Sequence, residues 1–183
     1  MIAVVDCGSA KVEALVAMIG ARRIALEDAR QALEADAVVI SGGPHLFTAE
    51  PSLIDAFAFI DDLRVPTLGI CLGHQAIALR AGAQVFLGPE RREAETIHIV
   101  QRHPLVDALP KDVTFVADHC EGVTLPDGFV RVASSSHYEN EIIACDERRL
   151  YGVQFHPEVS GDTGLTLLTS FLHLAKRSSA THG

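Results

Sequence analysis

The first half of the chain alternates short apolar runs with amphipathic segments. The apolar runs cover residues 2–6, 22–26, 36–41 and 66–70, and three of them are almost uninterrupted. Such runs are typical of strands covered on both faces, as in a parallel sheet. Between them lie helical patterns at residues 9–20 and 50–63, where Gly20 suits a helix end and Pro51 a first turn. The pattern therefore predicts strands that alternate with helices.

From residue 84 onwards the pattern changes to strand-like runs joined by turns. These runs cover residues 84–88, 95–100, 114–118, 130–136, 141–146 and 150–155. They predict a mixed or antiparallel extension of the sheet, followed by a closing helix at residues 164–177. We therefore expect an α/β fold, with an open mixed, mostly parallel sheet flanked by helices. One domain would span residues 1–177, and residues 178–183 would form a flexible tail.

Composition limits the cellular locations and the kinds of binding partner that are expected. The 183 residues carry a net charge of −9, which argues against nucleic acid or an anionic membrane as a partner. No stretch approaches the roughly 18 consecutive apolar residues of a membrane helix, and the N-terminal segment does not resemble a signal peptide. The four cysteines are scattered without a C-x-x-C pair. Free thiols and a cytoplasmic location are therefore expected.

Cys71 lies in the pattern Gly69-Ile70-Cys71-Leu72-Gly73, between a predicted strand and a predicted helix. A nucleophile between two such glycines is typical of a tight strand-to-helix turn. The amides and dipole of the following helix would favour a thiolate and, later, an oxyanion. The pattern alone leaves two interpretations open, a nucleophile or an unreactive buried cysteine beside packing glycines.

Two further segments follow predicted strands. His156 and Glu158 could act as a base and its orienting carboxylate, although a solvated pair would give the same sequence. The turn Ser41-Gly42-Gly43-Pro44 lies where ligands collect in open α/β sheets. Its exposed N–H groups could supply one oxyanion donor, with Leu72 N–H as the other, or it could be an ordinary loop.

Other chemistries fit the sequence less well. It contains neither a P-loop nor a G-x-G-x-x-G pattern. His156-Pro157-Glu158 matches the H-x-E of zinc deaminases, but their P-C-x-x-C partner is missing. The nine histidines include no H-x-x-x-H pair, so no metal site is expected.

Together, the three segments resemble those of the class I glutamine amidotransferases, which use a Cys-His-Glu triad. The matching motifs are GICLGHQ at 69–75, SGGP at 41–44 and GVQFHPE at 152–158, in the family's order. The resemblance implies the family's flavodoxin-like fold. It also implies that Cys71 attacks the carboxamide of L-glutamine, forms a thioester and releases ammonia. In that scheme His156 moves protons and Glu158 orients it.

The same resemblance implies the binding roles. Gly43 and Leu72 would hold the oxyanion through their N–H groups. The residues that would contact glutamine are Gln75, Asp118, His119 and Cys120. Asp118 stands where the family usually has Ser, and Cys120 where Gly or Met is common. A carboxylate would repel the α-carboxylate of glutamine, so Asp118 is expected to point away and contribute its backbone.

Within the family, the chain is most similar to the branch that serves GMP synthase. The similarity lies in residues 4–15, 114–136 and 148–164, with Ala10 where that branch usually has Gln. The chain contains no S-G-G-x-D-S phosphate loop and no length for a second domain. This implies a stand-alone, archaeal-type subunit that works with a separate ATP pyrophosphatase subunit. ATP and Mg²⁺ would bind that partner, which aminates XMP to GMP, and no cofactor is expected in this chain.

Other roles stay open at this level. The chain could serve a different synthetase, or hydrolyse γ-glutamyl compounds. It could instead be a non-catalytic subunit that binds glutamine and reports its concentration. The complete set of Cys71, His156 and Glu158 favours catalysis, because lost function usually shows in the triad.

Overall fold

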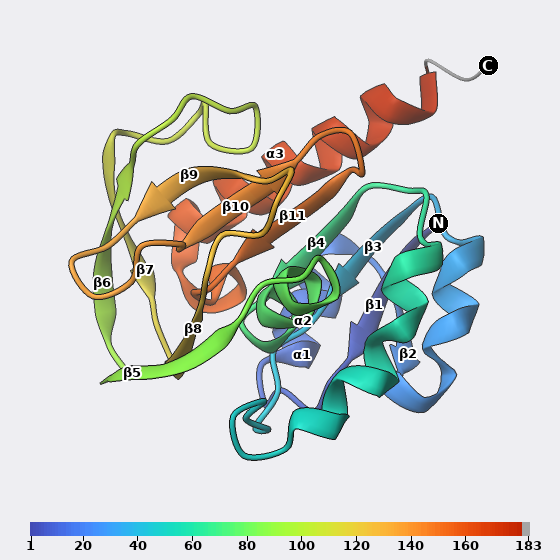
Figure 1. The fold of residues 1–183 in the computed structure, drawn as a ribbon. Coiled ribbons are helices and arrows are strands. Elements are labelled where there is room, and N and C mark those ends of the chain that lie inside the picture. Colours follow the sequence, from blue (N-terminus) through green and yellow to red (C-terminus); the bar gives the residue numbers. More distant parts are fainter. Residues whose placement is uncertain (181–183) are drawn as a thin grey trace.

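A nine-stranded sheet forms the centre of the computed structural model, which describes residues 1–180 and the side chains of residues 1–177 (Figure 1). Its strands are β1 (Ile2–Asp6), β2 (Arg22–Ala25), β3 (Ala37–Ile40), β4 (Thr67–Ile70), β6 (Ala94–Ile99), β7 (Asp112–Val116), β9 (Val130–Ser134), β10 (Ile142–Cys145) and β11 (Leu150–Val153). Their order across the sheet is β2-β1-β3-β4-β11-β10-β9-β6-β7. Strands β5 (Val85–Arg91) and β8 (His119–Val123) pair separately as an antiparallel ribbon.

The sheet has a parallel half and an antiparallel half. Strands β2, β1, β3, β4 and β11 run parallel to one another. From β11 outwards, β10, β9, β6 and β7 pair antiparallel. This arrangement confirms the predicted mixed, mostly parallel α/β sheet, with its antiparallel extension built from the second half of the chain.

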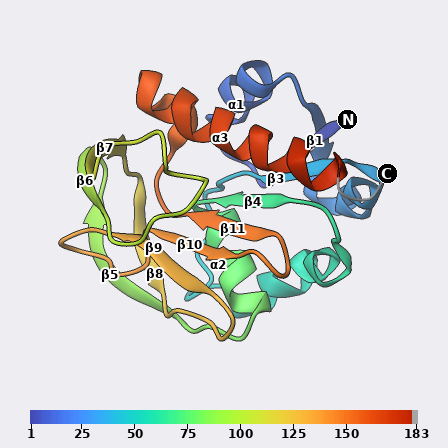
Figure 2. The same ribbon diagram turned by 90° about the horizontal axis from the view of Figure 1, so that it is seen from above.

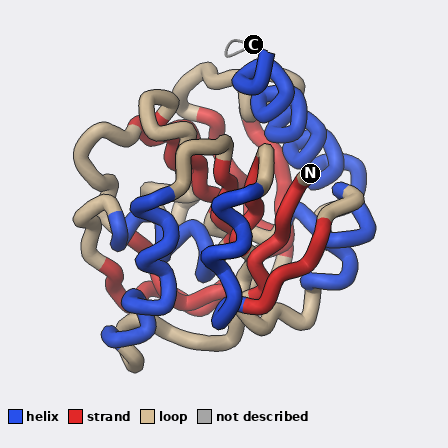
Figure 3. Tube along the Cα trace, turned by 90° about the vertical axis from the view of Figure 1, so that its right-hand side faces the viewer, coloured by secondary structure: helices blue, strands red, loops and turns tan. Residues whose placement is uncertain are grey.

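Helices cover both faces of the sheet. The α-helices are α1 (Val12–Ile19), α2 (Leu72–Arg80) and α3 (Gly161–Ala180), and the 3-10 helices are η1 (Leu26–Glu34), η2 (Pro51–Asp62) and η3 (Pro157–Val159). Helices α1 and α3 pack on one face, while η1, η2 and α2 pack on the other (Figures 2 and 3). No helix in the described part of the chain is long and apolar enough to cross a membrane.

Strand β3 shows why the first apolar runs contain so few polar residues. Ala37 and Val39 belong to the core beneath α1 and α3. Val38 and Ile40 belong to the core on the opposite face, beneath η1, η2 and α2. Successive side chains of a strand point to opposite faces, so a strand between two helical layers needs apolar residues at every position.

The structure differs from the expected elements in a few places. Residues 50–63 were expected to form a regular helix, but the segment is the 3-10 helix η2, and the polar segment η1 gave no helical signal. Strand β8 was not among the expected strands. Helix α3 runs through Ala180, three residues beyond its expected end, and the rest of the expected tail, residues 181–183, lies outside the described residues. Gly20 does end α1, in the left-handed conformation with φ 62°.

Candidate active site

The three sequence segments meet at one edge of the sheet. Strands β3, β4 and β11 are adjacent and parallel, so their C-terminal ends lie side by side. The glycine turn 41–44 follows β3, Cys71 follows β4, and His156 follows β11. Ligands of open α/β sheets bind at this edge, because loops there leave the strands and diverge.

Cys71 occupies a strained turn between β4 and α2. Its backbone angles, φ 51° and ψ −105°, lie outside the regions that non-glycine residues normally adopt. A Cβ at Gly69 would overlap the carbonyl oxygen of Gly73, and a Cβ at Gly73 would overlap the carbonyl oxygen of Ile40 in β3. Both glycines are therefore required by the close crossing of strand and helix, which holds the thiol at the start of α2.

His156 lies between Glu158 and Cys71. Its Nδ1 is 2.8 Å from Oε1 of Glu158, and both side chains are buried. A Cβ at Gly42 would lie 2.9 Å from His156 Cε1 and 3.4 Å from Cys71 Cβ, so the imidazole and the thiol converge beside that glycine. Burial lowers the pKa of His156, but hydrogen bonds with Cys71 and Glu158 outweigh it and raise the pKa to about 10. The environment therefore favours a charged imidazolium next to the sulfur.

Strand β7 and the hydroxyl of Ser160 hold the backbone of His156. Its N–H donates to the carbonyl of Val116 at 2.8 Å, and its carbonyl accepts from the Ser160 hydroxyl at 2.6 Å. The same hydroxyl accepts from the N–H of Val116 at 2.9 Å. The imidazole is thus fixed on a segment tied at both its N–H and its carbonyl, as a proton-transfer group requires.

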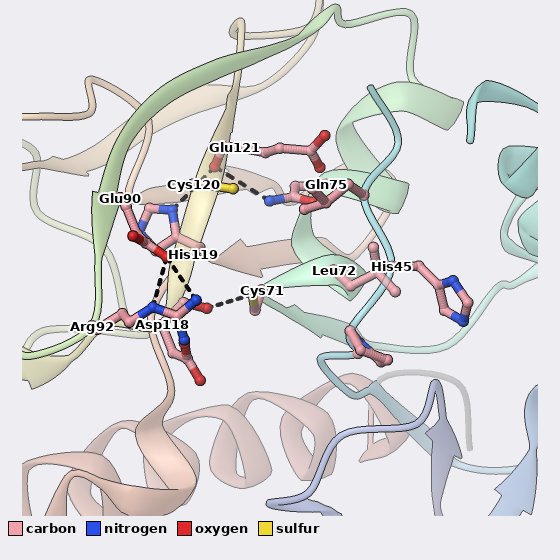
Figure 4. A pocket seen from close by; sticks show the side chains of 13 residues that line it. His45, Cys71, Leu72, Gln75, Glu90, Arg92, Asp118, His119, Cys120 and Glu121 are labelled. Carbon is pink, nitrogen blue, oxygen red and sulfur yellow. Dashed lines mark hydrogen bonds and ion pairs between the residues drawn. The ribbon is translucent and has the colours of Figure 1, made fainter. Parts of the chain in front are cut away.

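A cleft of about 370 Å³ opens above Cys71 (Figure 4). Its volume falls within the range of small-molecule sites, roughly 300–1,000 Å³. The sequence-predicted residues that line it are Gly43, Cys71, Leu72, Gln75, Asp118, His119 and Cys120. The other two, His156 and Glu158, lie buried behind the sulfur rather than in the lining. The structure therefore brings all nine sequence-predicted residues to one place.

Two buried polar side chains form the inner wall of the cleft. The amide nitrogen of Gln75 lies 3.3 Å from both the Glu121 carbonyl and the Gln154 side-chain oxygen. His119 contacts the same carbonyl through Nδ1 at 3.1 Å. Its Nε2 is buried and has no hydrogen-bond partner among the described residues. Burial lowers the pKa of His119 to about 4, so this imidazole is neutral near pH 7.

The family model of class-I glutamine amidotransferases matches residues 3–174 of the chain. The chain belongs to this family. Among its relatives, one subunit of the glutamine-hydrolysing GMP synthase from Methanosarcina barkeri is 37% identical over 147 residues, which cover 79% of this chain and 76% of that protein. The corresponding GMP synthase subunit from Archaeoglobus fulgidus is 35% identical over 150 residues, which cover 80% of each chain.

A solved structure supports the same fold. A Thermoplasma acidophilum protein, provisionally described as a GMP synthase subunit, superposes with a TM-score of 0.91 at 26% identity. The superposition covers 99% of this chain and 96% of that one. A Thermotoga maritima glutamine amidotransferase superposes with a TM-score of 0.72 at 22% identity, and this second likeness concerns the fold alone. The predicted amidotransferase fold is thus confirmed.

Sequence reasoning missed Glu121 in this amidotransferase site. Its buried carboxylate accepts hydrogen bonds from the N–H groups of Phe47, at 3.1 Å, and Thr48, at 2.7 Å. These bonds tie the loop after the glycine turn to β8, across the cleft. A single Glu within a strand that was not predicted gives no signal of such a contact. Had the strand been predicted, the spacing of two residues between His119 and Glu121 would have placed both side chains on one face.

Asp118 does not simply point away from the amidotransferase site. Its carbonyl oxygen lies 3.8 Å from Cys71 Sγ, as expected of a backbone contribution. Its carboxylate lines the cleft and pairs with the Lys11 ammonium at 2.7 Å. The hydrogen bond from Lys11 lowers the pKa of Asp118 and offsets its negative charge. Lys11 was not among the expected site residues.

No three His, Cys, Asp or Glu side chains within the described residues are grouped so that they could hold a metal ion. The chemistry that this arrangement can support is nucleophilic, because the thiol at the floor of the cleft is backed by a buried imidazole and a buried carboxylate.

Proposed function

We propose that this amidotransferase hydrolyses L-glutamine through a thioester on Cys71 and supplies the ammonia to a separate ATP pyrophosphatase subunit, which aminates XMP to GMP. The observation that carries the proposal is the convergence of Cys71, His156 and Glu158 at the adjacent ends of β4 and β11. The similarity to GMP synthase subunits from archaea supports the choice of acceptor.

The first half of the reaction releases ammonia. The Cys71 thiolate attacks the carboxamide carbon of glutamine, and the carbonyl oxygen becomes an oxyanion. As this intermediate collapses, the C–N bond breaks and the His156 imidazolium gives its proton to the leaving nitrogen. Ammonia leaves, and a γ-glutamyl thioester remains on Cys71. The raised pKa of His156 supports this step, because the proton to be delivered is already on the ring.

The second half restores the enzyme. Neutral His156 takes a proton from water, and the resulting hydroxide adds to the thioester carbon. The C–S bond breaks, glutamate leaves, and the thiolate again faces an imidazolium. Glu158 accepts a hydrogen bond from Nδ1 throughout, which keeps Nε2 for the sulfur and the water. Water consumed and ammonia released balance the reaction.

The N–H groups of Gly43 and Leu72 would bind the oxyanion. Both residues line the cleft beside Cys71, and Leu72 is the first residue of α2, where amides lack partners within the helix. A Cβ at Gly43 would overlap the Cys7 carbonyl and lie 2.9 Å from Leu72 Cδ2. Only glycine fits there, so the backbone of this turn lies directly against the start of α2.

Glutamine would lie along the inner wall of the cleft. Gln75, His119 and Cys120 line this wall, and the Asp118 carbonyl lies beside the sulfur. Neutral His119, with Nε2 unpaired among the described residues, offers a hydrogen-bonding group to a polar ligand. The residues thus supply polar contacts along the wall that ends at Cys71.

The pyrophosphatase partner would bind ATP, Mg²⁺ and XMP, and this chain would need no cofactor of its own. The archaeal relatives are named as single subunits of GMP synthase, which supports a partner encoded as another chain. A Synechococcus GMP synthase that is not named as one subunit matches at 34% identity over only 28% of its own length. Most of that longer protein therefore lies outside the part that matches this chain.

The test is reconstitution with an XMP-dependent ATP pyrophosphatase subunit. The mixture receives ATP, Mg²⁺, XMP and glutamine labelled with ¹⁵N in the amide, and glutamate and ¹⁵N-GMP are measured. We expect equal amounts of both products, and slow glutamine hydrolysis by the chain alone. Cys71→Ala should abolish the glutamine-dependent reaction and leave GMP formation from added ammonia intact.

Three results would overturn all or part of this proposal. GMP formation from ammonia but not from glutamine would mean that the chain serves another synthetase. Glutamine binding without any glutamate release in the complete mixture would instead indicate a regulatory subunit. Unimpaired hydrolysis by Cys71→Ala would remove the thioester mechanism itself.

A further inference from the structure

Arg92 is the one lysine or arginine among the described residues that line the cleft. It follows β5, directly beside the glutamate and aspartate of the lining, Glu90 and Asp118 (Figure 4). The fourth charged lining residue, Glu121, is already bonded to two backbone N–H groups. The mouth of the cleft therefore carries one cation between two carboxylates.

The contacts of Arg92 leave part of its guanidinium for a ligand. Its Nε and NH2 groups lie 2.6 Å from Oε1 of Glu90. Its NH1 group is 3.6 Å from Oδ1 of Asp118, which is too long for a hydrogen bond. A guanidinium has further N–H donors beyond the two used by Glu90, and it binds carboxylates in a bidentate manner.

Lys11 removes the electrostatic obstacle to an anion at this place. Asp118 alone would repel a carboxylate next to Arg92. The Lys11 ammonium, 2.7 Å from Oδ2 of Asp118, offsets that charge. Asp118 thereby contributes its carbonyl to the neighbourhood of Cys71 without presenting an uncompensated charge.

We propose that Arg92 binds the α-carboxylate of the substrate and Glu90 its α-ammonium group, while Lys11 neutralises Asp118 so that the carboxylate can enter. This inference rests on the proposed function and extends it, since it assigns the end of the cleft that recognises a free α-amino acid. The side-chain amide then reaches Cys71 at the other end. Arg92 and Glu90 are specificity-determining residues, and Lys11 is a positioning residue that acts through Asp118.

The experiment compares two electrophiles that modify Cys71 of the full chain. The chloroketone analogue of glutamine, L-2-amino-4-oxo-5-chloropentanoate, carries the α-amino acid group, whereas iodoacetamide does not. Second-order rate constants of labelling are measured by mass spectrometry of the Cys71 peptide. Iodoacetamide thus reports the reactivity of the thiol, and the ratio of the two rates reports recognition of the amino acid end.

Arg92→Gln should lower the chloroketone rate about tenfold and leave the iodoacetamide rate unchanged, because a charge-assisted contact is lost. The matched control is Arg148→Gln, which should leave both rates unchanged. Arg148 is an exposed cation in the turn that precedes β11, and the site lies beyond the other end of that strand. Arg92→Lys should recover only part of the rate, since an ammonium lacks the planar fork. The difference in chloroketone rate between the wild type and Arg92→Gln should shrink as NaCl is added.

Lys11→Met should also lower the chloroketone rate, because Asp118 is then uncompensated. Lys11→Met combined with Asp118→Ser should restore it, a rescue that a merely structural role for Lys11 would not produce. Unchanged chloroketone labelling of Arg92→Gln, or an equal fall with both electrophiles, would overturn the inference while leaving the proposed function intact. A wild-type chain that the chloroketone does not label at Cys71 would overturn both.

Discussion

Nδ1 of His156 and Oε1 of Glu158 are 2.8 Å apart, with a single proline between the two residues. His156 keeps extended backbone angles, and η3 begins at Pro157, so the carboxylate lies beside the imidazole instead of continuing along the strand. The side chains of both residues are buried. The contact fixes which ring nitrogen faces Cys71, and the consequences of that arrangement can be measured.

Glu158→Gln should lower kcat for glutamine hydrolysis on the order of 100-fold, with little change in KM. The amide keeps the volume but loses the negative charge that holds the imidazolium and its tautomer. Glutamate release by the reconstituted complex is the measurement. Glu139→Gln removes an exposed carboxylate that pairs with Arg131, and serves as the control. A Glu158→Gln enzyme with unchanged kcat would show that the carboxylate does not assist the base.

The imidazole of His156 should titrate near pH 10, far above the ordinary histidine pKa of 6.5. Hydrogen bonds with Cys71 and Glu158 cause the shift, so Cys71→Ala should lower the pKa. The ring proton signals of His156, followed by NMR across pH, give its pKa in the wild type and in Cys71→Ala. An unchanged pKa in Cys71→Ala would mean that the thiol and the imidazole are not coupled.

The raised pKa of His156 should also make the stability of the fold depend on pH. The pKa of His156 is higher in the folded chain than in the unfolded chain, so the charged ring stabilises the fold. This contribution is fully present below pH 6.5 and is lost as pH rises through about 10. Urea unfolding between these limits should show falling stability in the wild type. His156→Gln should remove that part of the pH dependence.

Local pattern was sufficient to predict the edge of the sheet that carries the chemistry. The apolar runs of β3 and β4 and the motifs that follow them placed Gly43 and Cys71 beside each other, and β11 added His156. These features are short-range, because each motif lies within a few residues of its strand. The fold followed from the same runs, since strands buried on both faces must be apolar throughout.

The charged contacts at the cleft mouth could not be read in this way. Lys11 pairs with Asp118 across 107 positions, and Glu121 binds the amide of Phe47 across 74. No periodicity links residues so far apart, and polar residues in turns are common for many reasons. Their pairing is decided by how β8 and its neighbouring loops pack against the sheet, which a single sequence does not specify.

Gly73→Ala should strongly destabilise the chain, by about 2 kcal/mol or more in the free energy of unfolding. Its Cβ would overlap the carbonyl oxygen of Ile40, so strand and helix would have to separate. Gly82→Ala is the matched control, since it has φ 95° but no atom within 4 Å of an added Cβ. It should cost only the backbone strain of about 1 kcal/mol. Equal losses in urea unfolding would contradict the close crossing at the elbow.

Glu141 should make the chain less stable as pH rises from 4.5 to about 8. Oε1 accepts a hydrogen bond from the Ser135 hydroxyl at 2.7 Å, while Oε2 is buried without a partner among the described residues. Burial raises the pKa of Glu141 to about 7, from an ordinary 4.5. The protonated side chain is therefore favoured in the folded state. Its contribution is fully present below pH 4.5 and is lost as pH rises through about 7.

Glu141→Gln should remove this loss, because a neutral amide of the same size has no charge to bury. We compare the free energy of unfolding of the variant with that of the wild type at each pH. Between pH 4.5 and pH 8 this difference should shift in favour of the variant by about 3 kcal/mol. Glu147→Gln, an exposed carboxylate in the turn between β10 and β11, should leave the wild-type slope unchanged. Parallel stability curves for Glu141→Gln and the wild type would mean that Glu141 is ionised in the folded chain and that its burial is compensated. The Glu141 window overlaps that of His156 above pH 6.5, so the two titrations are separated by comparing Glu141→Gln and His156→Gln in one series of urea unfolding curves.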